Sequence, residues 1–189
     1  MALSLSITAG PASEPVSVAE VKQALRLTTS ADDSVITRNI KAAREFAEKE
    51  TRRSLAAKSY LLSVDRFPYP HEPIRLPVPP LVSVTSIKFL DSTLTQQTWD
   101  SAEYFIADKQ VPALIVPKPG FVYPSPVFVP GAVEIAFISG VDPSEHIKEG
   151  IRQLAVHIYE HPEAINSEGL KEAPLALIYF FRANKIYVF

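Results

Sequence analysis

The sequence predicts an α+β protein in which a small helical bundle, made of two N-terminal helices and a C-terminal helix, carries an inserted, proline-rich antiparallel β subdomain. Apolar residues recur at helical spacing towards both ends of the 189-residue chain, whereas from Lys58 to Gly140 they alternate as in half-buried strands. Twelve of the 17 prolines lie between Pro68 and Pro130. Because proline cannot donate to a β-ladder, we expect these prolines in edges, turns and extended connections.

Residues 1–56 are expected to form the N-terminal helical part. Ser17 is followed by Glu20 three positions later, which is the spacing of a capping box at the start of a first helix. Ser30 is expected to cap a second, longer helix that runs from about Asp32 to Arg53, because the apolar residues of this stretch recur once per helical turn.

Residues 57–141 are expected to form the inserted β subdomain. Strands are predicted in "KSYLLSVDRF" and "GAVEIAFISG", where apolar and polar residues alternate, and in "SVTSIKFL", "TWDSAEYFIA" and "ALIV" between them. In the first of these middle segments the apolar positions change from one face to the other, which indicates burial on both faces or a bulge near Thr85 and Ser86. The stretch "KPGFVYPSPVFVPG" predicts a long, exposed, partly extended loop.

Residues 142–173 are expected to hold the C-terminal helix that completes the bundle. Asp142 is its predicted N-cap, Pro143 its first helical residue, and Pro162 its end. Residues 174–189 are unusually apolar for the end of a chain. We expect this tail to dock, either on a partner protein or on the chain's own helices, because a free apolar tail would be sticky in water.

The charge pattern argues against a protein that grips nucleic acid through its overall field. The chain has 19 basic and 21 acidic residues, a formal net charge of -2, whereas proteins that hold phosphate backbones are usually basic. A basic run over residues 38–53 is typical of a solvated helix face. The absence of cysteine excludes disulfides and thiol nucleophiles. We expect neither a membrane span nor a secretory signal, because no apolar run approaches about 20 residues and no basic residue precedes the first apolar ones.

One short motif matches a catalytic pattern. The sequence "HIYEH" places His157, Glu160 and His161 in the order of the inverted zinc peptidases, and on a helix the two histidines would lie one turn apart. A zinc-dependent hydrolase is therefore an alternative function. Only 28 residues follow His161 to supply a third ligand, and the helix dipole favours a C-terminal histidine without any metal. We therefore expect no catalytic residue, no bound metal and no cofactor.

Five segments in a fixed order carry a family likeness: "PVSVAEVKQALRL", "DDSVITRNIKAAREFAEKETRRSL", "DRFPYPHEPIRLPVPPLVSVTSIKFLD", "GAVEIAFISGVD" and "IKEGIRQLAVHIYEHPEA". The most specific piece is the pattern I-x-L-P-x-P-P-L-x-S-V-x-S-I from Ile74 to Ile87. Together they resemble the head–tail connector, or adaptor, family of tailed bacteriophages and related gene-transfer particles. Arg53 departs from the family pattern, which has a glycine at this place.

The resemblance implies a structural virion protein that catalyses no reaction. Family members are similar in forming a ring, here expected to be a dodecamer, below the portal of the capsid. Such a ring extends the DNA channel and provides the platform for stopper and tail proteins. The implied partners are further copies of the chain, the portal protein, a stopper or tail-completion protein, and double-stranded DNA in non-specific passage. The implied location is the head–tail neck of the virion, after assembly in the host cytoplasm. A DNA-packaging accessory factor is a further alternative.

Two sets of residues are candidate contacts under this interpretation. The apolar density at the chain end suggests that portal binding involves Tyr179, Phe180, Phe181, Arg182, Tyr187 and Phe189. The basic helix run suggests weak contacts with DNA in the channel through Arg38, Lys41 and Arg44.

Overall fold

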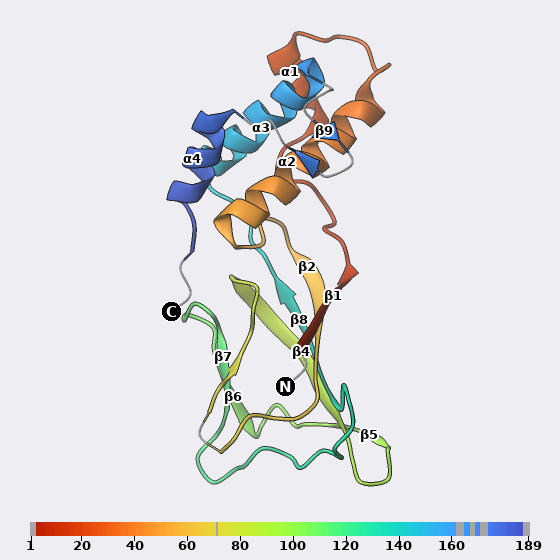
Figure 1. Cartoon of the computed structure of the whole chain (residues 1–189), viewed down its shortest axis with the longest axis vertical. Helices are drawn as coiled ribbons and strands as arrows, with labels where there is room; N and C mark the ends of the chain where they lie inside the picture. The colour runs from red at the N-terminus through yellow and green to blue at the C-terminus, as the bar shows by residue number, and fades with distance from the viewer. Residues whose placement is uncertain (1–2, 71, 162–164, 167–168, 171–173, 187–189) are drawn as a thin grey trace. The chain divides into compact units, whose positions relative to one another are not determined.

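The structure, a computed structural model, describes residues 3–70, 72–161, 165–166, 169–170 and 174–186 (Figure 1). The described residues form four helices and antiparallel sheets, which confirms the α+β class. They divide into two compact units. The β unit contains residues 3–12 and 57–141, and the helical unit contains residues 13–56 and the described residues from 142 to 186. None of the described helices is long and apolar enough to cross a membrane.

The helical unit is built from α1 (Val18–Leu25), α2 (Asp33–Thr51), α3 (Glu145–Glu160) and α4 (Leu175–Ala183). A short hairpin of β9 (Ile165–Asn166) and β10 (Gly169–Leu170) lies between α3 and α4 in the chain. The helices α2 and α3 contact each other most extensively, and α4 packs on both of them. The core consists of one apolar stripe from each helix, as amphipathic periodicity requires. Its fully buried members include Val21, Ile36, Ile40, Ala43, Ala47, Ile151, Leu154, Ala155 and Phe181.

The predicted N-cap is confirmed for α1 and is wrong for α2 and α3. Ser17 caps α1 in a complete capping box with Glu20. The predicted cap of α2 at Ser30 is wrong, because α2 begins at Asp33 with Asp32 as its N-cap. The Asp32 carboxylate does not cap the helix but accepts a hydrogen bond from the Tyr159 hydroxyl at 3.0 Å. A tertiary contact with α3 has thus replaced the local cap.

The predicted start of α3 is also wrong. This helix begins at Glu145 with Ser144 as its N-cap, so Asp142 and Pro143 precede it. Asp142 instead forms an ion pair with Lys148 at 2.7 Å, where a negative charge still lies near the positive end of the helix. The helix ends at Glu160 with His161 as its C-cap, and Pro162 lies outside the described residues. At the other long helix, α2 ends at Thr51 because Arg52 adopts a left-handed backbone with φ 56°.

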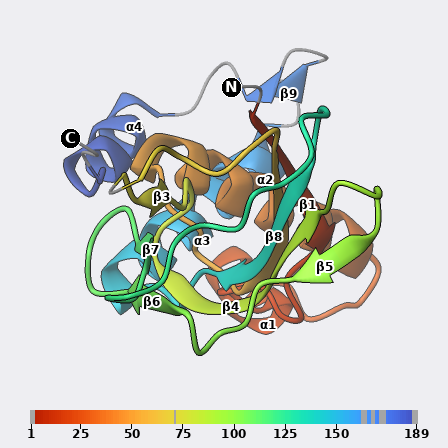
Figure 2. The ribbon, with the colours of Figure 1, turned by 90° about the horizontal axis from the view of Figure 1, so that it is seen from below.

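The β unit contains two sheets. The five-stranded sheet has the order β1-β2-β8-β4-β5, and its strands are β1 (Leu3–Ala9), β2 (Lys58–Val64), β8 (Val133–Ser139), β4 (Leu81–Leu90) and β5 (Gln96–Thr98). The three-stranded sheet has the order β3-β7-β6, with β3 (Ile74–Arg75), β7 (Leu114–Pro117) and β6 (Tyr104–Ala107). The smaller sheet lies to one side of β4 (Figures 1 and 2). All pairs of neighbouring strands in both sheets are antiparallel.

The core of the β unit is the face of the larger sheet that carries Leu62, Ile87, Ile135 and Phe137, all at most 1% exposed. The register of β4 against β8 shifts between Val84 and Ser86, so of the two alternatives that the sequence left open, the bulge near Thr85 is present. The shift moves the following apolar residues of β4 into the core. Aromatic rings complete this core, in a cluster of Phe67, Phe89, Trp99, Tyr104 and Tyr123.

The N-terminal segment differs from the sequence-based expectation. Residues 1–56 were expected to be helical, but Leu3–Ala9 form strand β1, which pairs antiparallel with β2. The strand therefore belongs to the β unit, together with residues 57–141. The loop over residues 118–131 has no regular secondary structure and exposes Phe121, Val122 and Phe128, as expected from its prolines.

Candidate interaction site

The last helix presents two different faces. On its inner face, Phe181 is fully buried and meets the ring of Phe46 edge-on, with 6.3 Å between ring centroids. Phe180 packs edge-on against His146 of α3, with 4.3 Å between centroids. It also lies over Gly150, where an added Cβ would come within 2.7 Å of the Phe180 ring. Glycine at this position therefore allows α4 to pack closely on α3.

The outer face of α4 is exposed and partly apolar. Leu175 is 70% exposed and Tyr179 is 66% exposed. Arg182 lies on the same stripe, because positions four and three residues apart on a helix are neighbours. Its guanidinium forms an exposed ion pair with Glu50 of α2 at 2.8 Å. Apolar side chains flanked by a cation form a surface that suits contact with another protein.

The chain after α4 is attached to the end of α2. The backbone N–H of Ile186 donates to the carbonyl oxygen of Thr51 at 2.9 Å, and Arg53 donates to the carbonyl oxygen of Asn184. The terminal segment thus packs on the chain's own helices through Phe180, Phe181 and these hydrogen bonds, while Tyr179 and Arg182 remain on the surface. Of the six residues predicted to bind a portal, Tyr187 and Phe189 lie outside the described residues.

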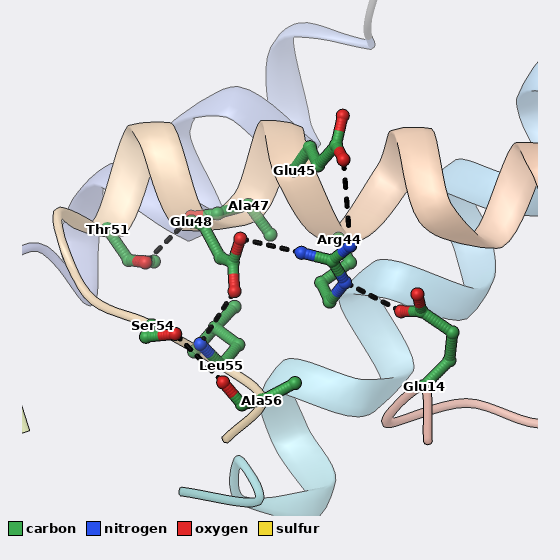
Figure 3. Close-up of polar contacts among 9 residues, drawn as sticks. All are labelled: Glu14, Arg44, Glu45, Ala47, Glu48, Thr51, Ser54, Leu55 and Ala56. Atoms are coloured by element: carbon green, nitrogen blue, oxygen red, sulfur yellow. Dashed lines mark hydrogen bonds and ion pairs between the residues drawn. The ribbon is translucent and has the colours of Figure 1, made fainter. Parts of the chain in front are cut away.

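Arg44 lies at the centre of a buried cluster of charges, hereafter the Arg44 cluster, which Figure 3 shows in close-up. Although it is charged, its side chain is only 2% exposed. Its Nε donates to Glu14 at 2.6 Å, its Nη1 donates to Glu48 at 2.7 Å, and Nη2 lies 3.6 Å from Glu45. The second oxygen of Glu48 accepts the backbone N–H of Leu55 at 3.0 Å.

The electrostatics of the Arg44 cluster keep the arginine charged. Burial opposes the charge, but the hydrogen bond to Glu14 and the charge of Glu48 outweigh it, so the pKa of Arg44 is raised above its ordinary value. Glu14 lies just before α1, and Leu55 lies just after α2. The cluster therefore fastens two connecting segments of the helical unit to the middle of α2.

The basic residues of α2 differ in what they offer to a ligand. Arg38 and Lys41 are exposed, whereas Arg44 is buried and its charge is matched by three carboxylates. Only the first two present their charges to solvent. The sequence could not separate the three residues, because all of them fall on one polar run of the helix and the partner Glu14 lies 30 residues away.

The histidine motif lies at the end of α3. The rings of His157 and His161 stack with 4.6 Å between centroids, and Glu160 is exposed. Among the described residues, no group of three or more His, Asp or Glu side chains is placed to hold a metal ion. A zinc centre needs at least three protein ligands, which these positions do not assemble.

The proline-rich loop borders a groove of about 750 Å³ on the β unit. Tyr123 forms part of its wall, stacks on Phe67 at 5.4 Å between centroids, and donates its hydroxyl to the carbonyl oxygen of Glu72 at 2.7 Å. Burial raises the pKa of Tyr123 to about 12. The groove is lined mainly by proline, aromatic and aliphatic residues, together with Arg66, Glu72 and Lys118.

Comparisons with known proteins identify relatives of the sequence and of the fold. Residues 15–89 match the family described as "Phage gp6-like head-tail connector protein". This match confirms the resemblance that the sequence motifs indicated, over a segment that contains α1, α2 and the pattern from Ile74 to Ile87. No curated protein matches the chain.

Solved structures share the fold over nearly the whole chain. A chain in the neck of an empty gene transfer agent particle, computed with C6 symmetry, is 21% identical with a TM-score of 0.74. A chain in the virion of the native particle is 22% identical with a TM-score of 0.70, and one in the native neck computed with C12 symmetry is 19% identical with a TM-score of 0.71. Each alignment covers 98% of this chain and 97% of the other.

Proposed function

Residues 15–89 carry the head–tail connector signature, and on that premise we propose that this protein is a structural component of the neck of a tailed phage or gene-transfer particle. The observation that carries the proposal is the agreement of two comparisons. The family match covers the first helices and the most specific motif, and the fold of neck proteins extends over 98% of the chain. A connector of this kind performs no catalysis.

Each copy of the protein acts as one subunit of an adaptor ring between the portal and the tail. The solved neck structures were computed with C6 and C12 symmetry, which supports a ring of twelve copies here. A closed ring of identical subunits needs a head-to-tail contact between two different surfaces of each copy. The ring extends the DNA channel and provides the platform on which stopper or tail-completion proteins assemble.

The portal contact is assigned to the last helix and the chain end. Its exposed stripe supplies Tyr179 and Arg182 directly, and Leu175 is added by the structure. Phe180 and Phe181 contribute by holding α4 on α2 and α3. Tyr187 and Phe189 complete the proposed set of portal-binding residues.

Contact with DNA in the channel is assigned to Arg38 and Lys41, two exposed basic residues of α2. Arg44 supports the structure of α2 and does not contact DNA directly, because its charge is neutralised by carboxylates of the Arg44 cluster. Contacts through these two cations per subunit, in a chain of net charge -2, are weak and screened by salt. Weak contacts are suitable for a conduit through which DNA must pass.

The test is retention of the chain on its cognate portal protein after co-expression. We expect wild-type protein to be retained, and the Leu175→Ser, Tyr179→Ser double variant to lose at least about tenfold in affinity, because exposed aromatic and aliphatic anchors carry most of an interface's energy. Tyr69→Ser is the matched control, since Tyr69 is a tyrosine of similar exposure (64%) in the β unit.

Circular dichroism and the fluorescence of Trp99, the only tryptophan, verify that each variant is folded. If wild-type protein does not associate with portal, the connector function is wrong. If the double variant binds as well as wild type, the function stands and the assignment of the portal contact to α4 is wrong. Binding to DNA alone, with a steep dependence on salt, would instead favour a DNA-packaging accessory factor.

A further inference from the structure

The five-stranded sheet ends at a strand that lacks the usual protection of a sheet edge. All seven residues of β1 are exposed, and within the described chain the strand pairs only with β2. Edge strands of soluble proteins are normally guarded by a charge, a proline or a strong bulge, because their unpaired backbone groups recruit other strands. The sequence of β1, LSLSITA, contains neither a charged residue nor a proline, and its register irregularity against β2 lies at the end of the strand, between Ile7 and Ala9.

The same strand carries a row of apolar side chains that continues the core. Leu3, Leu5 and Ile7, hereafter the edge row, are 59%, 38% and 58% exposed. They lie opposite Val64, Leu62 and Tyr60 of β2, respectively, all of which are buried. Directly opposed residues of antiparallel strands project to the same face of a sheet. The edge row is therefore part of the core face that the β unit leaves uncovered.

A groove of about 290 Å³ opens beside this row. Its walls include Leu3, Leu62, Val64, Phe67 and Ile74. The buried core face thus continues into this groove at the β1 end of the sheet, where Arg66, Glu72 and Arg75 also line it. The free backbone edge of β1 and the open apolar face are two independent features. One additional strand alongside β1 would pair with the backbone edge and cover the apolar face.

The opposite side of the sheet offers a matching edge. Strand β5 pairs only with Lys88, Phe89 and Leu90 of β4. The preceding residues of β4, Leu81–Ser86, have no strand on that side among the described residues. This half of β4, with the sequence LVSVTS, is also uncharged, and its Val82 is 51% exposed. Both edges are thus neutral, which argues for contact with protein and against contact with a nucleic acid.

The directions of the two edges are compatible. The order β1-β2-β8-β4 alternates at each step, so β1 and β4 run in opposite directions. A second copy, rotated about an axis roughly parallel to the strands, would bring its β1 antiparallel to β4 of the first. The new pair would then be of the same kind as every other pair in the sheet.

We propose that β1 of one copy adds to the free side of β4, Leu81–Ser86, of the next copy, with the edge row covered by that neighbour. The inference rests on the proposed ring, because it names one of the head-to-tail contacts that a ring requires. A strand of seven residues is about 23 Å long. It buries much less than the roughly 800 Å² per partner of a stable interface, so this contact forms only when other contacts of the neck already hold the copies together.

The experiment is disulfide trapping, which is clean because the chain has no cysteine of its own. We would introduce Ser6→Cys together with Ser83→Cys, and Ser4→Cys with Ser83→Cys or Ser6→Cys with Thr85→Cys to sample the register. Within one chain, β1 and β4 are separated by β2 and β8, about 14 Å at the usual strand spacing. A disulfide spans less than about 7 Å between Cα atoms, so every bridge formed joins two copies.

The variants are co-expressed with the cognate portal, and the isolated rings are oxidised and separated under denaturing conditions. We expect a ladder of covalent multimers from at least one register. Ser6→Cys with Ser34→Cys, an exposed position of α2 in the helical unit, is the control and stays monomeric. Leu5→Lys, which puts a charge on the edge row, lowers the yield of rings at least about tenfold and leaves the thermal transition reported by Trp99 unchanged.

The outcomes separate this contact from the function on which it rests. Normal rings without a ladder, or with Leu5→Lys assembling like wild type, overturn the β1–β4 contact and leave the connector function intact. A bridge from position 6 to a different protein of the neck overturns the assignment of a second copy. If wild-type chain forms no ring with portal at all, the ring function is wrong, and this contact is wrong with it.

Discussion

Replacing Arg44 by methionine removes the cation of the Arg44 cluster while keeping an unbranched side chain that fills a similar space. Glu48, whose side chain is 13% exposed, and Glu14, at 23%, then lose this cation in a partly buried site. Removal of one member of a buried ion pair costs about 3–5 kcal/mol, because an unpaired charge is left behind. Glu14 retains some water and Glu48 retains the N–H of Leu55. We therefore expect a loss of about 3 kcal/mol in the free energy of unfolding of the helical unit.

The assay is urea unfolding followed by circular dichroism at the helical band. Arg38→Met, an exposed position of the same helix, is the control and changes stability by less than about 0.5 kcal/mol. Adding Glu48→Gln to Arg44→Met removes one orphaned charge and keeps an oxygen for the Leu55 N–H, so the double variant recovers part of the loss. A stability of Arg44→Met within about 0.5 kcal/mol of wild type would show that the cluster is not a structural anchor.

Two further predictions test the other packing and titration features. Gly150→Ala gains helix propensity worth about 1 kcal/mol, but its methyl group would lie 2.7 Å from the Phe180 ring. We therefore expect a net loss of stability in urea unfolding and faster hydrogen exchange in α4. A more stable variant would contradict the close packing of α4 on α3. The pKa of Asp91 is lowered to about 2, first by the hydrogen bond from the Thr93 hydroxyl and then by that from Gln97. The stability that ionised Asp91 contributes to the β4–β5 turn is therefore complete above its ordinary pKa of 3.8 and is lost as the pH falls through about 2. In an NMR titration Thr93→Val raises the Asp91 midpoint towards 3.8, and an unchanged midpoint would be the contrary result.

The prolines before β4 illustrate how local stiffness serves this fold. The chain bends over residues 77–80, where the peptide bond between Pro79 and Pro80 is cis, and β4 begins at the next residue, Leu81. The carbonyl oxygen of Pro80 accepts the N–H of Gly140, which joins the start of β4 to the end of β8. The proline-rich pattern from Ile74 to Ile87 thus sets the position at which β4 enters the sheet. Its role is structural, in agreement with a connector signature that contains no reactive side chain.

Local features of the fold were predictable from the sequence because neighbouring residues determine them. The capping box of Ser17 and Glu20 lies within one helical turn, and the bulge at Thr85 follows from a change of parity within a single strand. The alternation in β2 and β8 and the helical period of α2 likewise depend on a few consecutive side chains. The family pattern from Ile74 to Ile87 was also readable in this way, since it is one continuous segment.

Long-range partners were decided only by the tertiary structure. Residues of β1 pair with residues of β2 that lie at least 50 positions further along the chain. The short LSLSITA segment forms a strand only because β2 lies beside it. In the sequence Arg44 is indistinguishable from the surface cations of α2. Only the structure shows that it is paired with Glu14, which lies 30 residues away in the chain. Phe181 and Tyr179 are two positions apart and both aromatic, yet Phe181 is buried and Tyr179 is 66% exposed. Periodicity tells which side chains share a face, but which face is covered depends on the elements that arrive from elsewhere in the chain, because burial is a property of the packed unit and not of the segment.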